Sequence, residues 1–524
     1  MTQFLNQPTI IIFDFGSQYT QLIARRIREQ NTYCELLPHD LKASDVKKIN
    51  PIGIVLSGGP NSVYEDDSLQ IDPEILKLQI PILGICYGAQ LLVHMLGGKV
   101  INSDKQEYGR TSINVVSESL LFKGLPQSFN CWMSHGDSIT LLPDGFKTVA
   151  STDNTINAVI ESEYKKIYAL QFHPEVNHTE HGNKIIEHFV VDICKSKKDF
   201  TPQKFIDYTI KEINKSILPS TKVVLALSGG VDSTTLAVLL NKCIPENLIC
   251  IFVDHGLLRK DEAVKLNKIF KDVLKLNVIT VDARDRFLAK LANVTDPEKK
   301  RIIIGHEFIE VFKQETINMS NVEYLAQGTL YPDVIESAGS HLLHKNLKGV
   351  AHKIKSHHNV GGLPENVPFK LIEPFNLLFK DEVRNIAKAL SIPDIITMRQ
   401  PFPGPGLAIR IIGSVTKEKL ELLQLADDIV QSEINAANLG SEIWQAFAIL
   451  VPVKSTGVMG DKRTYADQIV LRAVTSSDGM TADWAKLPYP VLERISTRIV
   501  NEVKGINRVL YDITAKPPAT IEWE

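Results

Sequence analysis

Three short apolar runs of this sequence each meet a glycine turn, and a helical pattern follows each of them. The runs lie at residues 9–15 (TIIIFDF), 81–86 (PILGIC) and 222–227 (KVVLAL). Apolar runs of this length beside glycine are typical of buried strands, so each pattern predicts a strand, a tight turn and a helix. Such units assemble into parallel sheets covered by helices. The sequence therefore predicts two α/β parts, one opening near residue 9 and one near residue 222.

The bulk properties are those of an ordinary globular protein with several domains. At about 150 residues per domain, 524 residues predict three to four domains. A net charge of −3 gives no reason to expect nucleic acid or a membrane as partner. The six cysteines form no C-x-x-C pair, so neither a zinc site nor a redox couple is indicated. The N-terminus lacks a signal-peptide pattern and no apolar run approaches about 18 residues, so we expect a cytoplasmic location.

Two stretches predict boundaries between domains. The polar segment 195–203 (KSKKDFTPQ) resembles a linker. The segment 399–408 (RQPFPGPGLA) holds three prolines and two glycines, which prevent regular structure. Beyond it, helical and strand-like patterns alternate and predict a small α+β domain. The helical patterns cover 416–437 and 488–504, and the strand-like runs cover 466–475 and 506–514.

The first candidate for chemistry is Cys86, in the pattern Gly84-Ile85-Cys86-Tyr87-Gly88 between a predicted strand and a predicted helix. This is the arrangement of a nucleophile elbow with cysteine in place of serine. The glycines leave room for a strained turn, and the helix N-terminus favours a thiolate. A lone cysteine is more often a buried structural residue, so the pattern needs support from elsewhere in the chain.

That support comes from two further strand ends. His173-Pro174-Glu175 follows the strand-like run IYALQF, and the period of two in a strand places both side chains on one side. A thiolate nucleophile needs such a base with an orienting carboxylate. Ser57-Gly58-Gly59-Pro60 ends another strand and offers backbone N–H groups of the kind that form an oxyanion hole, although a plain tight turn explains it equally well.

Taken together, these motifs resemble the class I (triad) glutamine amidotransferases. The matching segments are FDFGSQY (13–19), SGGP (57–60), GICYGAQ (84–90), WMSHGD (132–137) and FHPE (172–175). The resemblance implies a flavodoxin-like domain over residues 8–197, with Cys86 as nucleophile, His173 as base and Glu175 as its orienting group. It also implies an oxyanion hole at the 58–59 turn (Gly58 and Gly59), with the oxyanion held by the backbone of Gly59 and Tyr87. The glutamine would be held by Gln90 with the backbone near Ser134, His135 and Asp137.

A second candidate site is a glycine-rich loop between the strand at 222–227 and a helix. Its residues are Ser228, Gly229, Gly230, Val231, Asp232, Ser233 and Thr234. Successive N–H groups in such a turn at a helix N-terminus bind anions such as phosphates. Asp232 repels phosphate, so its expected partner is a Mg²⁺ ion on the phosphates. The lysine of G-x-x-x-x-G-K-[ST] is missing, which excludes that nucleotide loop.

The S-G-G-x-D-S string resembles the PP-loop of N-type ATP pyrophosphatases. That resemblance implies a second doubly wound parallel sheet over residues 198–399. It implies ATP as co-substrate, cut between the α and β phosphates. Val253, in the strand end FVDHG (252–256), would lie beside the adenine, and Lys380 would reach the pyrophosphate.

With both modules in this order, further segments resemble the family of glutamine-hydrolysing GMP synthetases. The segments are GTLYPDVIES (328–337), KSHHNVGGLPE (355–365), PFPGPGLAIR (401–410), YDIT (511–514) and KPPATIEWE (516–524). The resemblance implies xanthosine 5′-monophosphate (XMP) as acceptor and a dimerising domain over 400–524. The XMP contacts it implies are Arg301, Asp461, Lys516 and Glu522. The loop 355–365 is a candidate lid over the nucleotide or an ordinary exposed loop.

Two other interpretations remain at this point. One is another amidotransferase fused to a PP-loop ligase that aminates a different acceptor. The other is a binding protein that keeps an inactive amidotransferase, although none of its catalytic positions is altered. Binding of nucleic acid, as in tRNA-modifying PP-loop enzymes, would need a basic surplus that this chain lacks.

Overall fold

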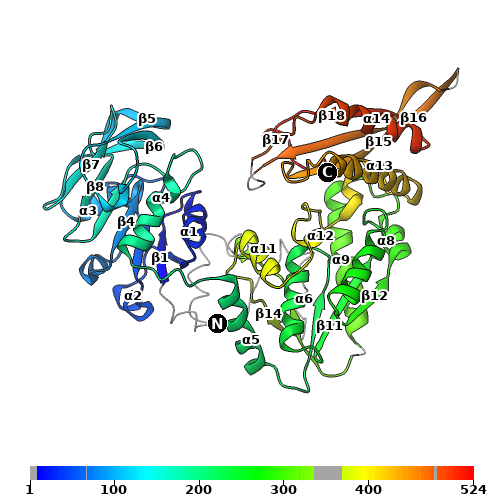
Figure 1. Cartoon of the computed structure of the whole chain (residues 1–524), viewed down its shortest axis with the longest axis horizontal. Helices are drawn as coiled ribbons and strands as arrows, with labels where there is room; N and C mark the ends of the chain where they lie inside the picture. Colours follow the sequence, from blue (N-terminus) through cyan, green and yellow to red (C-terminus); the bar gives the residue numbers. More distant parts are fainter. Residues whose placement is uncertain are drawn as a thin grey trace. The chain divides into compact units, whose positions relative to one another are not determined.

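The structure is a computed structural model that describes residues 9–66, 68–317, 319–334, 369–459, 461–476, 479 and 481–524. The chain divides into two compact units, the first ending at Phe205 and the second beginning at Ile206 (Figure 1). The division falls beside the predicted linker at 195–203. The predicted lid at 355–365 lies outside the described residues.

The first unit is built on a nine-stranded sheet in the order β2-β1-β3-β4-β9-β8-β7-β5-β6. Its strands are β1 (Thr9–Asp14), β2 (Tyr33–Pro38), β3 (Gly53–Leu56), β4 (Ile82–Ile85), β5 (Lys99–Val115), β6 (Ser128–Leu141), β7 (Lys147–Ser151), β8 (Val159–Ser162) and β9 (Ile167–Leu170). The five strands from β2 to β9 pair in parallel, and the other four pair antiparallel. The predicted α/β class is confirmed for this part.

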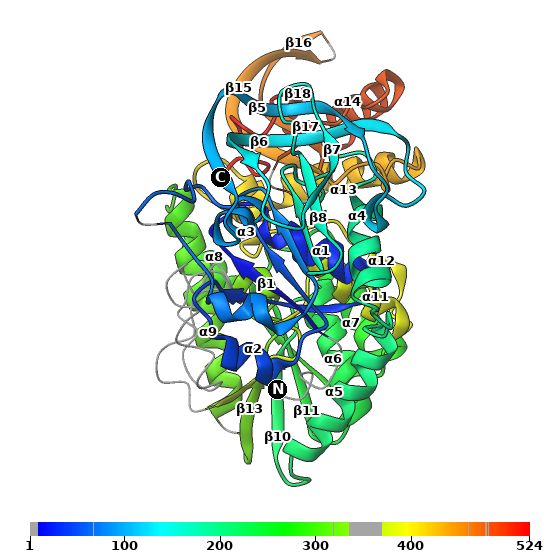
Figure 2. The same ribbon diagram turned by 90° about the vertical axis from the view of Figure 1, so that its left-hand side faces the viewer.

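Helices cover both the parallel strands and the ends of the sheet. They are α1 (Thr20–Glu29), α2 (Ala43–Ile49), η2 (Pro73–Leu78), α3 (Tyr87–Met95), η3 (Leu120–Phe122), α4 (Gly182–Glu187) and η4 (His188–Ile193). The central strands β3, β4, β8 and β9 are buried throughout, as expected for strands covered on both faces. Figure 2 faces this unit, with the long β5–β6 pair at one end and α2 at the other.

The last helix of the first unit is not regular. The segment 181–198 (HGNKIIEHFVVDICKSKK) has the pattern of a closing helix, and the chain leaves α-helical geometry at His188 and forms a wider π-helical turn, η4. Bonds such as Cys194 N to Phe189 O, five residues apart, define that turn. The side chain of His188 is bonded to the Leu121 carbonyl at 2.8 Å, which anchors the helix where its winding changes.

The second unit opens with a five-stranded parallel sheet in the order β12-β11-β10-β13-β14. Its elements are α5 (Pro202–Ser216, which spans the division), β10 (Lys222–Ala226), α6 (Val231–Cys243), β11 (Leu248–Asp254), α7 (Glu262–Lys268), η5 (Ile269–Val273), β12 (Val278–Asp282), α8 (Arg284–Leu291), α9 (Pro297–Ile317), β13 (Val322–Ala326), β14 (Lys370–Ile372), α11 (Lys380–Ala389) and α12 (Asp394–Thr397). The predicted parallel sheet is present.

The C-terminal part adds a small second sheet, as the α+β pattern predicts. Its elements are η6 (Gly406–Arg410), α13 (Lys417–Ala436), β15 (Gln445–Met459), β16 (Lys462–Thr475), β17 (Asp483–Trp484), α14 (Tyr489–Glu502) and β18 (Ile506–Asp512). β16 pairs antiparallel with β15 and β17 and parallel with β18. The β15–β16 hairpin projects beyond the helices α13 and α14 (Figures 1 and 2).

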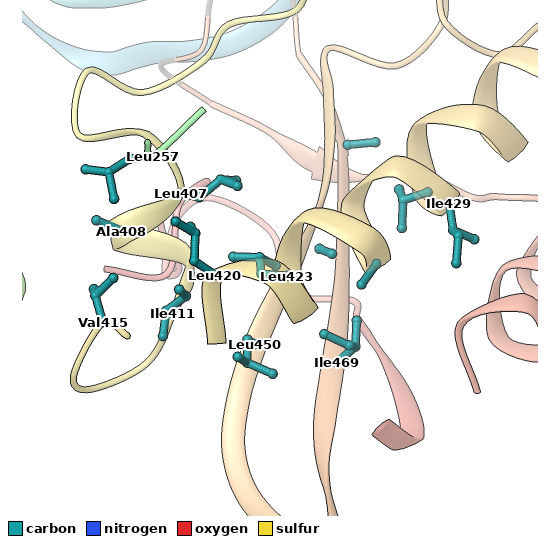
Figure 3. Packing of buried hydrophobic residues seen from close by; sticks show 14 of the residues in the cluster. Leu257, Leu407, Ala408, Ile411, Val415, Leu420, Leu423, Ile429, Leu450 and Ile469 are labelled. Atoms are coloured by element: carbon teal, nitrogen blue, oxygen red, sulfur yellow. The ribbon is translucent and has the colours of Figure 1, made fainter. Parts of the chain in front are cut away.

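One hydrophobic cluster joins the two sheets of the second unit. It contains Leu257 from the loop after β11, Leu407 from η6, Leu423 from α13 and Leu450 from β15, all of them fully buried. Figure 3 shows these side chains converging where η6 meets α13. The proline-rich segment at 399–408 therefore turns the chain inside one compact body. The predicted domain limits 8–197, 198–399 and 400–524 stay predictions.

Candidate active sites

The three amidotransferase motifs meet at one edge of the first sheet. Ser57 follows β3, Cys86 follows β4, and His173 comes shortly after β9; these strands are parallel neighbours. The carboxyl ends of parallel strands meet at the same edge, which is where open α/β sheets bind their ligands. Topology therefore gathers motifs that are up to 116 residues apart in the sequence.

Cys86 occupies the strained turn that the elbow pattern predicts. Its backbone lies at φ 51° and ψ −107°, and its N–H donates to the Leu170 carbonyl at 2.7 Å. A Cβ at Gly88 would lie 2.4 Å from the Leu56 carbonyl oxygen, and one at Gly84 would lie 2.6 Å from the Gly88 carbonyl oxygen. Both distances are too short for a carbon atom, so the elbow requires glycine at both positions.

His173 and Glu175 form a buried pair beside the cysteine. The Nδ1 of His173 donates to Oε1 of Glu175 at 2.7 Å, and both side chains are buried. Burial lowers the pKa of His173, but the Glu175 charge and hydrogen bonds to Glu175 and Cys86 outweigh it and hold that pKa well above its usual value. A charged imidazolium beside the sulfur is the arrangement that stabilises a thiolate. Arg26 donates to the Glu175 carbonyl at 3.0 Å and fixes the loop.

The predicted oxyanion turn lies against this pair. A Cβ built at Gly58 would be 3.2 Å from Cε1 of His173, and one at Gly59 would be 3.2 Å from the ring of Tyr87. The turn thus approaches both the base and the residue that follows the nucleophile. The structure brings Gly58, Gly59 and Tyr87 together with the three catalytic candidates.

The residues predicted to hold glutamine come from β6 and, for Gln90, from α3. The Cys86 Sγ is 3.6 Å from the Ser134 carbonyl oxygen, and the Gln90 amide donates to the Asp137 carbonyl at 3.0 Å. His135 is different, because its ring is buried and turned toward Glu107 on β5. The role that the resemblance implies at His135 belongs to the backbone, so it stays a prediction, and the side chain has other partners.

Sequence motifs did not single out two side chains of this site. Gln171 is fully buried, and its amide lies 3.8 Å from the Cys86 Sγ and 3.2 Å from the Gln90 amide nitrogen. Its position two residues before His173 is a usable signal, since alternate residues along an extended segment share a side. Glu107 carries no local signal, because only the pairing of β5 with β6 brings it to His135.

The glycine-rich loop has the form of an anion site at the start of α6. Gly230 is the N-cap of the helix, and Gly229 takes φ +78°, a conformation that favours glycine. The hydroxyls of Ser228 and Ser233 are 2.9 Å apart, and that of Ser228 accepts from the Gly230 N–H. The loop leads directly into the N-terminus of α6, where backbone N–H groups suit phosphate oxygens.

Asp232 and Lys380 lie side by side at this loop, at a distance of 3.6 Å. Burial raises the pKa of Asp232, although Lys380 acts in the opposite direction. One oxygen of Asp232 and the hydroxyl of Thr234 are buried without a hydrogen-bond partner among the described residues. Val253 is buried near the end of β11, beside β10 that leads into the loop. The described residues hold no cluster of three or more metal-binding side chains.

Three of the four residues predicted for XMP meet the C-terminal tail or its surroundings. Arg301 donates to the carbonyl of Glu524, and Lys516 donates to the Gly479 carbonyl at 2.9 Å. Glu522 accepts two bonds from Arg410, at 2.7 and 3.0 Å. The tail is therefore held by several cations, of which Arg410 is fully buried.

Asp461 is not brought to the other three. It lies in the turn between β15 and β16, whereas Lys516 bridges to Ala482 beside β17, at the opposite end of β16. The 14 residues of β16 span roughly 45 Å at about 3.3 Å per residue. Within one chain, Asp461 and Lys516 cannot contact one ligand of nucleotide size.

An aromatic ring connects the tail to the phosphate loop. The guanidinium groups of Arg399 and Arg410 lie 5.5 and 5.2 Å from the centre of the Phe402 ring. Arg399 also donates to the Gly229 carbonyl at 2.6 Å, and Arg410 holds Glu522. The segment 399–410 thus contacts both the loop and the tail, which its turn-rich composition alone did not reveal.

Comparisons with known proteins agree with these two candidate sites. Residues 11–193 match the glutamine amidotransferase class-I family, residues 202–293 match the PP-loop domain, and residues 432–523 match the GMP synthase C terminal domain. The chain is thus a class I glutamine amidotransferase joined to an ATP-using PP-loop enzyme.

Full-length relatives define the family further. The GMP synthase [glutamine-hydrolyzing] of Caldanaerobacter subterraneus subsp. tengcongensis is 55% identical over 99% of this chain and 100% of its own. That of Brachyspira hyodysenteriae is 55% identical over 99% of both chains, and that of Geobacillus kaustophilus is 54% identical over 99% of this chain and 100% of its own. The chain belongs to the family of glutamine-hydrolysing GMP synthases.

Proposed function

We propose that this chain converts XMP to GMP, with ATP as the activating substrate and glutamine as the nitrogen donor. The full-length similarity to GMP synthases carries the proposal, and the two separate constellations at Cys86 and at 228–234 support it. The enzyme is an ATP-dependent carbon–nitrogen ligase. In this reaction the O2 oxygen of XMP attacks the α-phosphorus of ATP and releases pyrophosphate. Ammonia then attacks C2 and displaces AMP.

In the proposed glutaminase, the sulfur of Cys86 attacks the carboxamide carbon of glutamine. The N–H groups of Gly59 and Tyr87 stabilise the oxyanion that forms. His173 gives its proton to the departing nitrogen, which leaves as ammonia. Water then attacks the thioester, His173 takes up a proton of that water, and glutamate is released. Glu175 holds the imidazole in the orientation that both steps need.

Asp232 and Thr234 fit a Mg²⁺ ion carried by the phosphates of ATP. Each places a buried oxygen without a hydrogen-bond partner among the described residues at the phosphate loop, and Mg²⁺ prefers oxygen ligands. The bound ion would neutralise charge on the phosphates as pyrophosphate leaves. Lys380 adds a second positive charge at the same place, and the N–H groups at the start of α6 add hydrogen bonds.

The proposed XMP site needs a second copy of the chain. Arg301, Lys516 and Glu522 lie at or near the tail, and Asp461 lies on a projecting hairpin at the other end of β16. If Asp461 contributes to the site, it comes from a partner subunit. We therefore propose a homodimer formed through the C-terminal part.

The cytoplasmic location stays a prediction from the sequence. Among the described residues, we find no helix with the length and apolar composition that crossing a bilayer requires.

The acceptor is tested with purified protein, ATP, Mg²⁺ and glutamine. AMP and pyrophosphate should form only when XMP is present, with one GMP for each AMP. Turnover with another acceptor and none with XMP would favour the alternative, a PP-loop ligase of different specificity.

A further inference from the structure

A buried glutamate outside every sequence motif lies behind the segment proposed to hold glutamine. Glu107 on β5 is 4% exposed and is opposite His135 on β6. It accepts hydrogen bonds from the hydroxyls of Thr152 and Thr155, at 2.7 and 2.8 Å. The proposed chemistry uses no carboxylate at this place, so Glu107 needs another explanation.

The ring of His135 lies between two oxygen acceptors. Its Nδ1 is 2.9 Å from the Asp137 carbonyl oxygen, and its Nε2 is 3.3 Å from Glu107. Oxygen atoms at both ring nitrogens hold the plane of the imidazole in one orientation. Burial raises the pKa of Glu107, but hydrogen bonds from His135, Thr152 and Thr155 outweigh it and bring that pKa below its usual value. The arrangement is that of a buried histidine–carboxylate pair.

Further hydrogen bonds lead from this pair to the nucleophile. The Asp137 carbonyl also accepts from the Gln90 amide at 3.0 Å, and the same amide lies 3.2 Å from Oε1 of Gln171. The amide of Gln171 then lies 3.8 Å from the Cys86 Sγ. All of these groups are buried. A chain of contacts thus joins a glutamate on β5 to the reacting sulfur.

We propose that Glu107 is a positioning residue for glutamine hydrolysis. It fixes the ring of His135, which holds the Asp137 backbone and, through Gln90 and Gln171, the surroundings of Cys86. It touches neither substrate nor sulfur, and this inference rests on the roles proposed above for Cys86 and Gln90. Loss of the charge at Glu107 frees the ring of His135 to turn, so the glutamine site loses its fixed shape.

The first unit offers a matched control for the same chemical change. Glu161 on β8 is fully buried, accepts a hydrogen bond from Ser119 and pairs with Lys147 at 3.1 Å. None of its contacts reaches the glutamine site among the described residues. Glu161→Gln therefore reports what loss of a buried carboxylate does to the fold alone.

The test compares GMP formation with glutamine and with ammonium in the full chain. Glu107→Gln should lower kcat/KM for glutamine at least roughly tenfold, mainly by raising KM, because a displacement near 1 Å costs about a hundredfold. Its ammonium-dependent activity should stay within about twofold of wild type. Glu161→Gln should change neither activity by more than about twofold, and Thr155→Val, which removes one hydrogen bond, should lie between the two glutamate variants.

Labelling of Cys86 separates positioning from folding. A diazoketone analogue of glutamine should label Glu107→Gln more slowly than wild type, whereas iodoacetamide, which needs no glutamine site, should label both at the same rate. Equal kcat/KM values for glutamine in Glu107→Gln and Glu161→Gln would overturn the inference. It would also be overturned if Glu107→Gln lost as much activity with ammonium as with glutamine. If Glu107→Gln fails to fold, Thr155→Val takes its place in the test. A KM for glutamine in Thr155→Val equal to that of wild type would then overturn the inference.

The proposed function and this inference fail in different ways. A wild-type protein that forms GMP from ammonium but not from glutamine would refute the proposed glutaminase, and the inference with it. A wild-type protein active with glutamine, together with an unaffected Glu107→Gln, would refute the inference alone.

Discussion

The close approach of Gly88 to β3 predicts the effect of adding a single methyl group. A Cβ at this position would lie 2.4 Å from the Leu56 carbonyl oxygen and 2.6 Å from the Leu56 Cβ. Carbon atoms do not approach closer than 3.0 Å, so α3 or the end of β3 must shift by at least 0.6 Å in Gly88→Ala. An ordinary contact at 3.4 Å needs a shift of 1.0 Å. Cys86, two residues earlier, moves with it.

The expected cost follows from this displacement. Overpacking destabilises by about 1–3 kcal/mol. In a unit of this size that lowers the melting temperature by roughly 2–12 °C. A misplacement near 1 Å costs about a hundredfold in rate, so kcat/KM for glutamine should fall roughly 10- to 100-fold. Ammonium-dependent GMP formation should stay within about twofold of wild type, because Gly88 lies in the first unit and the phosphate loop in the second.

A coupled assay of AMP release with either nitrogen source measures both effects. The control is Gly440→Ala, where the added Cβ meets Asn435 at an ordinary 3.6 Å and both activities should be preserved. Wild-type kinetics with glutamine in Gly88→Ala would refute the claim that the elbow depends on this close approach.

Three further predictions concern charged and aromatic groups of the two sites. Burial lowers the pKa of His173, but Glu175 raises it on balance. Wild type should therefore be more stable than Glu175→Gln by the full amount below about pH 6.5, and this difference should shrink as the pH rises through the raised pKa of His173. Melting curves of both proteins at several pH values measure the difference. Asp232→Asn should reduce GMP formation about a hundredfold or more with either nitrogen source. Because burial raises the pKa of Asp232, the charged carboxylate costs stability. Asp232→Asn should therefore melt at the wild-type temperature or above it, and a lower melting temperature would contradict the placement of Asp232 in a buried site. Phe402→Leu removes the ring beside Arg399 and Arg410 and should raise the KM for ATP or XMP roughly 3- to 30-fold in the ammonium assay. Unchanged KM values for both substrates would contradict this role of the ring.

Much of the fold was predictable where structure is local. β1, β4 and β10 lie in apolar runs whose neighbouring glycines and helical patterns identify a strand and the helix after it. β15 was missed because Pro452 and the register shift between Val451 and Ser455 interrupt its pattern. The π-helical turn after His188 was missed because the apolar pattern of 181–198 is short and does not distinguish one wider turn from a continuous α-helix.

The residues of the candidate sites also fall into two groups, those with a local sequence signature and those that only the fold brings together. Cys86 and His173 stand in motifs with a local signature, and the sheet order then brings them together. Glu107 and Arg399 act through groups far away in sequence, so only strand pairing and chain reversal reveal them. Asp461 shows the opposite case, because the family resemblance implied a shared XMP site and a single chain keeps it away from Lys516.

The central claim is that glutamine hydrolysis at Cys86 and amination at the phosphate loop are separate reactions of one enzyme. GMP formation by Cys86→Ala with ATP, Mg²⁺ and XMP tests it most directly. The account predicts no GMP from glutamine and a rate within about twofold of wild type from an ammonium salt. Loss of GMP formation with both nitrogen sources, in a variant that melts like wild type, would contradict it.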